Sequence, residues 1–150
     1  MRLAPASLLI RGSFALALAC AVTLPACATY RDQLARSQVA FEQNDHERAL
    51  ALLRNMEIDL TRLTPSERAH YAYLRGMTDY RMGYRVDARH WLALAKAYEE
   101  ASPGVLPADW RARTSEALEE MNGIVQEGGL KALAASQRPG EASDTARPSN

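Results

Sequence analysis

Three histidines could bind a metal ion or transfer protons near neutral pH, namely His46, His70 and His90. Histidines that bind zinc usually lie one helical turn apart, as in H-x-x-x-H, or have a cysteine or an acid at comparable spacing. No second histidine and no cysteine lies at such spacing from any of the three. We therefore expect packed or solvated histidines and no metal site.

Carboxylates are plentiful, but their spacing does not suit acid–base catalysis. The densest groups are the adjacent pairs 99–100 and 119–120, both Glu-Glu. Adjacent residues of a helix point about 100° apart, so neither pair can face a common substrate. The sequence also contains no G-x-S-x-G elbow and no glycine-rich phosphate loop. We predict that the chain is not an enzyme, has no catalytic residue and uses no cofactor.

The overall composition narrows the class of partner. Lys and Arg together number 18, as do Asp and Glu, so no basic excess points to nucleic acid. A chain of 150 residues suits one domain, and its many Ala and Leu residues favour helix over sheet. The two cysteines both lie within the first 27 residues, which excludes a disulfide framework for the folded part.

The N-terminal segment, residues 1–26, is typical of a secretory signal peptide. Arg2 and Arg11 are its only charges, and the run FALALACAVTL is apolar over 11 residues. A signal-peptide core needs about 7–15 apolar residues, whereas a membrane span needs about 20. The segment therefore predicts export rather than a membrane-spanning helix.

Cys27 is the residue at which a modification is expected. The preceding residues complete the stretch LPAC, which resembles the bacterial lipobox, where the cysteine thiol receives a diacylglyceryl group before cleavage on its amino side. The resemblance implies a lipoprotein with a short tether over residues 27–31. Because Ala28 rather than Asp follows, it also implies an acyl anchor in the outer membrane, with the protein facing the periplasm. Pro25 departs from the usual lipobox residue at its position.

Two other cleavage patterns remain open. The stretch LALAC ends at Cys20 and also has lipobox residue types, although cleavage there would divide the apolar run. Residues 26–28 form an A-x-A site for ordinary signal peptidase. Ordinary cleavage would release a soluble periplasmic protein.

The mature chain predicts an all-α fold. The third helix has the clearest start, because Thr64, Pro65 and Glu67 form a capping box with proline at the first helical position. The expected helices cover residues 32–43, 45–60, 64–83, 86–101 and 108–127. The domain is therefore expected over residues 32–127. Residues 128–150 have few apolar side chains and predict a disordered tail.

The helices contain a repeated pattern. Ala49 and Ala88 each lie early in the second helix of a pair, 39 residues apart, and Gly76 and Gly83 precede Ala88 in the first helix and the turn. This pattern resembles the tetratricopeptide repeat, although the spacing exceeds that family's period of about 34 residues. The resemblance covers about residues 33–101. It implies a short array of two helix pairs, closed by a C-terminal capping helix, with small residues where helices touch.

In that family the first helix of each pair lines a groove that binds peptides or helices of partner proteins. Carried over to this sequence, the resemblance implies a partner-binding groove; its candidate residues are Leu34, Gln38, Phe41, Tyr73, Met77, Tyr80 and Arg81. We therefore expect a non-catalytic adaptor for a protein of the cell envelope that helps to assemble an outer-membrane complex. It would contact the membrane only through its lipid anchor. The alternative is a soluble periplasmic module that binds a peptide or small ligand.

Overall fold

The computed structural model describes residues 25–136, with side chains from Tyr30 onward. The predicted signal peptide up to residue 24, the alternative Cys20 and the tail beyond residue 136 lie outside these residues. The helices are α2 (Pro25–Glu42), α3 (His46–Met56), the 3-10 helix η1 (Glu57–Arg62), α4 (Pro65–Met82), α5 (Arg85–Ala101) and α6 (Ala108–Ala135).

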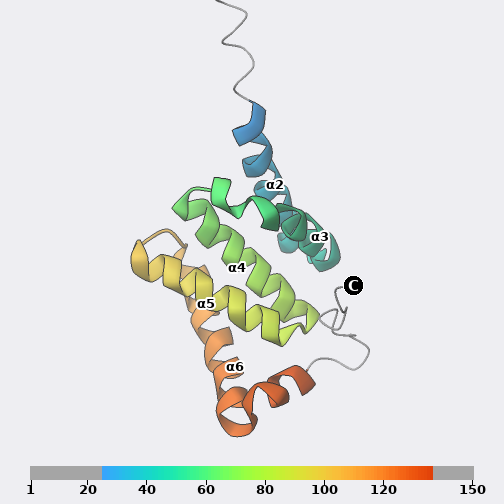
Figure 1. The fold of residues 1–150 in the computed structure, drawn as a ribbon, viewed down its shortest axis with the longest axis vertical. Helices are drawn as coiled ribbons and strands as arrows, with labels where there is room; N and C mark the ends of the chain where they lie inside the picture. Colours follow the sequence, from blue (N-terminus) through green and yellow to red (C-terminus); the bar gives the residue numbers. More distant parts are fainter. Residues whose placement is uncertain (1–24, 137–150) are drawn as a thin grey trace, which may run out of the picture.

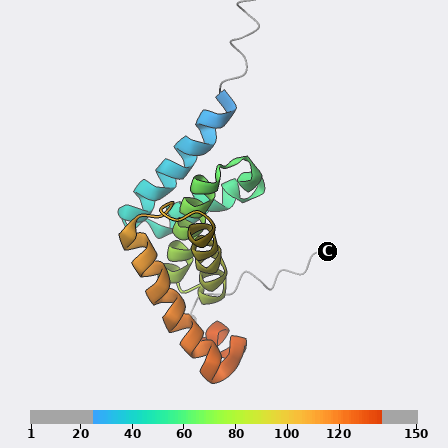
Figure 2. The same cartoon turned by 90° about the vertical axis from the view of Figure 1, so that its left-hand side faces the viewer.

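Each α-helix after α2 packs against the α-helix that precedes it (Figure 1). The most extensive contacts join α4 to α5 and α2 to α3, and α6 then packs against α5. Figure 2 shows α2 and α6 along one side of the molecule, with α3, α4 and α5 beside them. The expected all-α array of two helix pairs and a C-terminal helix is confirmed, and the described residues contain no strand.

Local sequence signals set most helix ends. The Asp45 side chain caps α3 by accepting a hydrogen bond from the Arg48 backbone N–H. Thr64 and Glu67 form the predicted capping box of α4, each side chain accepting from the other's backbone N–H. Gly83 ends α4 in the left-handed conformation (φ 91°), which costs glycine little because it has no Cβ.

Small residues lie where the paired helices approach most closely. A Cβ added at Gly76 of α4 would lie 2.7 Å from Leu92 Cγ and 2.9 Å from the Leu92 backbone nitrogen on α5. Ala88 on α5 and Ala49 on α3 are fully buried. These positions therefore control how closely the helices of each pair can pack.

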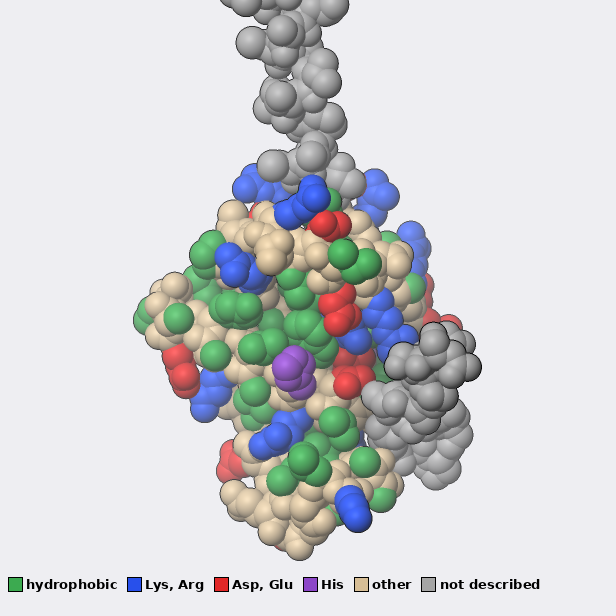
Figure 3. All heavy atoms as spheres, viewed as in Figure 1, with side chains coloured by type: hydrophobic (Ala, Val, Ile, Leu, Met, Phe, Trp, Pro, Cys, Tyr) green, Lys and Arg blue, Asp and Glu red, His purple; other side chains and the backbone are tan. Residues whose placement is uncertain are grey.

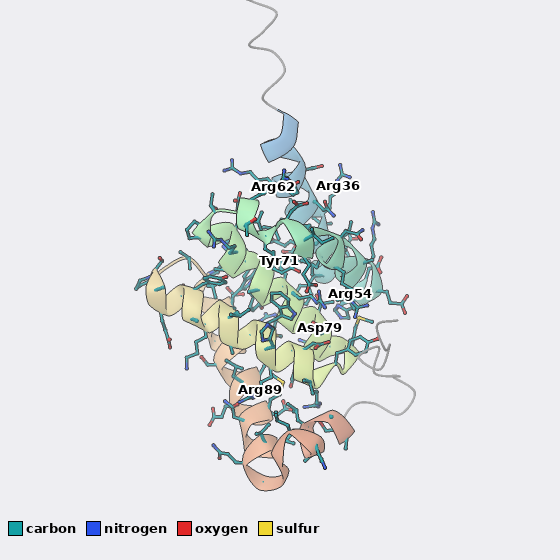
Figure 4. The ribbon with its side chains drawn as sticks, viewed as in Figure 1. Arg36, Arg54, Arg62, Tyr71, Asp79 and Arg89 are labelled. Atoms are coloured by element: carbon teal, nitrogen blue, oxygen red, sulfur yellow. The ribbon has the colours of Figure 1, made fainter. Side chains whose placement is uncertain are left out.

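A buried aromatic and charged cluster joins α3, α4 and α5. The Tyr71 hydroxyl donates to the Leu53 carbonyl at 3.1 Å, and its ring meets Trp91 edge to face at 5.4 Å. Burial raises the pKa of Tyr71 to about 12. Arg75 lies over the Trp91 ring and donates to Asp79 on the same helix, 2.8 Å away. Figure 4 shows Tyr71 and Asp79 along α4 within this packed region.

The N-terminal half differs from the sequence prediction in two places. Helix α2 begins at Pro25, so residues 27–31, predicted as a tether, are helical. Proline is well suited to a first helical turn, where its missing N–H is not needed. Helix α3 ends at Met56, and the chain tightens into η1 before Leu63.

The predicted C-terminal boundary at residue 127 also needs correction. Gly129 has φ 73° and ψ −177°, a conformation open essentially to glycine alone, so α6 bends there but continues to Ala135. After the bend, Leu133 is completely buried in the core. Residues 128–135 therefore belong to the folded domain, because the bend returns their apolar face to it. Figure 1 shows this last arm turned away from the axis of α6.

Candidate binding site

The structure buries two of the groove residues predicted on α4. Tyr73 is completely buried and stacks on Trp110 of α6, with ring centroids 4.1 Å apart. Met77 is only 3% exposed. Burial also raises the pKa of Tyr73. The prediction for these two residues is therefore corrected: α6 covers this side of α4, and they form core contacts rather than an open surface.

Three other predicted groove residues are buried or hydrogen-bonded to neighbouring side chains. Leu34 is buried, and the Gln38 side chain donates to Glu42 one turn along α2. The Tyr80 hydroxyl donates to Glu120 of α6, which raises the pKa of Tyr80. Arg85 also binds Glu120, at 2.5 Å. Tyr80 is therefore engaged in holding α6 against the second helix pair.

Phe41 and Arg81 both lie near His46. The half-buried Phe41 ring lies 5.6 Å from the His46 ring, at an angle of 49°. Burial, and then the nearby Arg81 charge, lower the pKa of His46. Arg81 is exposed. Of the predicted groove residues, all within the described part of the chain, only Arg81 is exposed, whereas Phe41 packs against the core.

A larger groove lies elsewhere, between α5 and the two arms of α6. We call it the α5–α6 groove; its volume is about 510 Å³. Helix α5 contributes a stripe at spacings of three and four residues, opposite its buried face: Val86, Arg89, His90, Ala93, Lys96, Ala97 and Glu100. The two alanines keep the middle of this stripe open because they carry no long side chain.

Helix α6 supplies the remaining walls of the α5–α6 groove. Leu118 and Asn122 come from its first arm, and Leu130 and Leu133 come from the arm after the bend at Gly129. Leu130 is 59% exposed, and Val86 on the opposite wall is 40% exposed. Figure 3 shows hydrophobic side chains gathered over α5 and the adjoining part of α6, with basic side chains among them. The groove is thus an open, mixed aliphatic and basic surface.

The charged side chains of the groove are only lightly engaged. Arg89 Nε donates to Asn122 Oδ1 at 2.8 Å, which ties α5 to α6. Figure 4 places Arg89 between these two helices. Within residues 25–136, the structure gives Arg89 no ion pair. Lys96 lies 3.9 Å from Glu100, and both side chains are more than half exposed. Such an exposed pair contributes little and can be exchanged for a ligand's charge.

This arrangement is suited to binding a ligand. The groove combines apolar walls with a few polar groups, which is the usual composition of a ligand site. It lacks a nucleophile held by a base, and over residues 25–136 no cluster of three or more His, Cys, Asp or Glu side chains could hold a metal ion. In the same part of the chain, no helix has the length and apolar character to cross a membrane.

Comparison with known proteins gives no relative. No protein-family model, curated protein or solved structure matches the chain. The interpretation of the site therefore depends on its own geometry and chemistry.

The sequence contained signals for the α5–α6 groove that the prediction did not use. On α5, residues 86, 89, 93, 96 and 100 recur at helical spacing on the face opposite Ala88, Leu92 and Ala95. The second signal is Leu130 and Leu133, three residues apart just after Gly128-Gly129. The glycine pair indicated a helix stop, whereas the following leucines indicate a further apolar turn. The groove itself depends on the return of α6, which no local pattern specifies.

Proposed function

We propose that the protein is a non-catalytic adaptor of the bacterial cell envelope that binds a protein partner in its α5–α6 groove. The observation that carries the proposal is the groove itself: an accessible hollow of about 510 Å³ that is lined by the exposed Val86 and Leu130 together with Arg89 and Lys96. Exposed aliphatic side chains grouped in one concave place are typical of an interaction site.

The envelope part of the proposal comes from the N-terminal sequence. Signal-peptide composition up to residue 26 and the lipobox-like stretch before Cys27 favour an acyl anchor. Helix α2 begins two residues before Cys27, so an anchor there would join the domain through a helix. We expect the partner to be another envelope protein, and assembly of an outer-membrane complex is the role that this combination favours.

Cys27→Ala tests the anchor. We expect the wild-type chain, expressed from its own start codon, to fractionate with the outer membrane and to show an acyl increment in its intact mass. The variant should lose both properties, because it lacks the thiol. A wild type that is soluble, unmodified and indifferent to the substitution would contradict the anchor.

Ala97→Trp tests the adaptor role. The indole would occupy the open middle of the groove, so we expect proteins that co-purify with the wild-type chain from detergent-solubilised envelopes to be lost. Ala51→Trp, at an exposed alanine of α3, is the matched control and should retain them. Thermal unfolding of both variants checks that the fold is intact. Retention by Ala97→Trp of every protein that the control retains would reject the groove as the binding site.

The volume of the groove also favours a second candidate, a soluble periplasmic module for a peptide or small ligand. Sites for small ligands commonly measure about 300–1,000 Å³, and the α5–α6 groove falls within that range. The Cys27→Ala experiment separates the two candidates, because only the adaptor requires the anchor.

A further inference from the structure

The α5–α6 groove has two chemically different parts. At one end, Arg89 and His90 lie on α5 opposite Asn122 of α6. Farther along α5, Ala93 and Ala97, which we call the alanine floor, line the groove together with Leu118, Leu130 and Leu133 of α6. Lys96 lies on the same α5 stripe as this floor. The groove therefore offers cationic groups immediately beside an aliphatic surface.

Arg89 is placed to bind an anion. Its Nε donates to Asn122 Oδ1 at 2.8 Å, so the guanidinium is held at the wall and its two terminal nitrogens keep donors for a ligand. Within residues 25–136 no carboxylate neutralises it. The one acid among the lining residues, Glu100, lies beside Lys96 instead. A carboxylate at the Arg89 end would thus meet a held cation without displacing an existing ion pair.

The aliphatic part is placed to bind a branched apolar side chain. Leu130 and Leu133 come from the arm after Gly129 and line the same groove as the alanine floor of α5. Leu133 is buried and fixes this arm, whereas Leu130 is 59% exposed and available to a ligand. Burying such an exposed leucine against an incoming aliphatic group is favourable, at about 25 cal/mol per Å².

The geometry points to a specific kind of occupant: a peptide segment of a protein partner in which Asp or Glu stands next to Leu, Ile or Val. This inference rests on the proposed function and adds the chemistry of the partner. The stripe from Val86 to Glu100 is about 21 Å long at the rise of an α-helix, which accommodates about six extended residues. The carboxylate binds at Arg89, and the aliphatic side chain enters between Leu130 and the alanine floor.

Heptapeptides displayed on phage provide the probe. A random library is selected on the full chain in detergent micelles, and the best peptide is synthesised together with an analogue in which each Glu or Asp is replaced by Gln or Asn. Both peptides are titrated against the wild type, Arg89→Gln and Ala97→Trp, with Arg48→Gln as the matched control at an exposed arginine of α3. Circular dichroism verifies that each variant keeps its helices.

We expect the selected peptide to bind the wild type and Arg48→Gln alike, and to bind Arg89→Gln about tenfold more weakly, as the loss of one charge-assisted hydrogen bond predicts. On the wild type, the neutral analogue should bind about tenfold more weakly than the selected peptide. On Arg89→Gln, which lacks the cation, the two peptides should bind with nearly equal affinity. If the selected peptide binds the wild type and Arg89→Gln equally while Ala97→Trp prevents its binding, this inference is wrong but the proposed function is not. Peptides that Ala97→Trp does not block would overturn the proposed function as well.

Discussion

Gly76→Ala is expected to lower the free energy of unfolding by about 2 kcal/mol, the middle of the range for overpacking a close contact. The added Cβ would lie 2.7 Å from Leu92 Cγ and 2.9 Å from the Leu92 backbone nitrogen. The leucine side chain can turn aside, but the backbone nitrogen can move only if α5 moves with it. Alanine's better helix propensity, about 1 kcal/mol over glycine, offsets only part of this cost.

Gly123→Ala is the matched control for this substitution. Gly123 also lies inside a helix, α6, but an added Cβ there meets no atom within 4 Å. Gly123→Ala should therefore raise the free energy of unfolding by up to about 1 kcal/mol through helix propensity alone. Urea unfolding followed by circular dichroism measures both variants. If Gly76→Ala were as stable as Gly123→Ala, the close contact between α4 and α5 would not exist as described.

Arg75→Met is expected to have the largest effect on stability, a loss of about 3–5 kcal/mol at pH 8, because it leaves a buried carboxylate without its partner. Asp79 is completely buried, and Arg75 Nε donates to its Oδ2 at 2.8 Å. The Asp79 Oδ1 atom has no hydrogen-bond partner among the described residues. Methionine keeps most of the arginine's aliphatic bulk, so the loss should be chiefly electrostatic.

The loss of stability in Arg75→Met should depend on pH, because Asp79 must be ionised for its buried charge to be left unpaired. Burial raises the pKa of Asp79 from 3.8 to about 6, and Arg75 opposes that rise. The folded state therefore holds this proton more tightly than the unfolded state, and the stability linked to Asp79 is full below pH 4 and lost as pH rises through 6. Without Arg75 the pKa rises further, so Arg75→Met should lose much less stability at pH 5 than at pH 8.

A second substitution separates the charge from packing. Arg75→Met combined with Asp79→Asn removes the buried charge and should recover most of the stability lost at pH 8. It should also remove most of the difference between pH 5 and pH 8 that the single variant shows. A double variant as unstable as Arg75→Met at both pH values would mean that the arginine does not act through Asp79. It would then act through its ion pair with Glu57, 2.9 Å away, or through packing on Trp91, which it overlies at 5.5 Å.

Local patterns in the sequence predicted the helix ends better than the binding surface. The capping box at Thr64 and the left-handed Gly83 depend on residues within one turn, so they can be recognised without a fold. The burial of Tyr73 depends on Trp110, which lies 37 positions further along the chain and reaches it only when α6 docks. An aromatic residue at helical spacing cannot by itself reveal whether another helix covers it.

The α5–α6 groove likewise depends on contacts between distant parts of the chain, which local sequence patterns do not specify. The α5 stripe around Ala93 and Ala97 is visible in the sequence, but it becomes concave only because α6 bends at Gly129 and brings Leu133 back to the core. Two consecutive glycines predict an interruption and do not predict the direction that the chain takes afterwards. The groove is therefore defined by the three-dimensional packing of α5 and α6 and not by a local sequence pattern.

The most direct measurement of the central claim is site-specific photocrosslinking in living cells. A photoreactive benzophenone amino acid replaces Ala97 in the α5–α6 groove of the full chain, and Ala51 on α3 serves as the control position. We predict an adduct of one discrete size from position 97 after irradiation, and none of that size from position 51. No adduct from position 97, or the same adducts from both positions, would contradict a binding site in the groove.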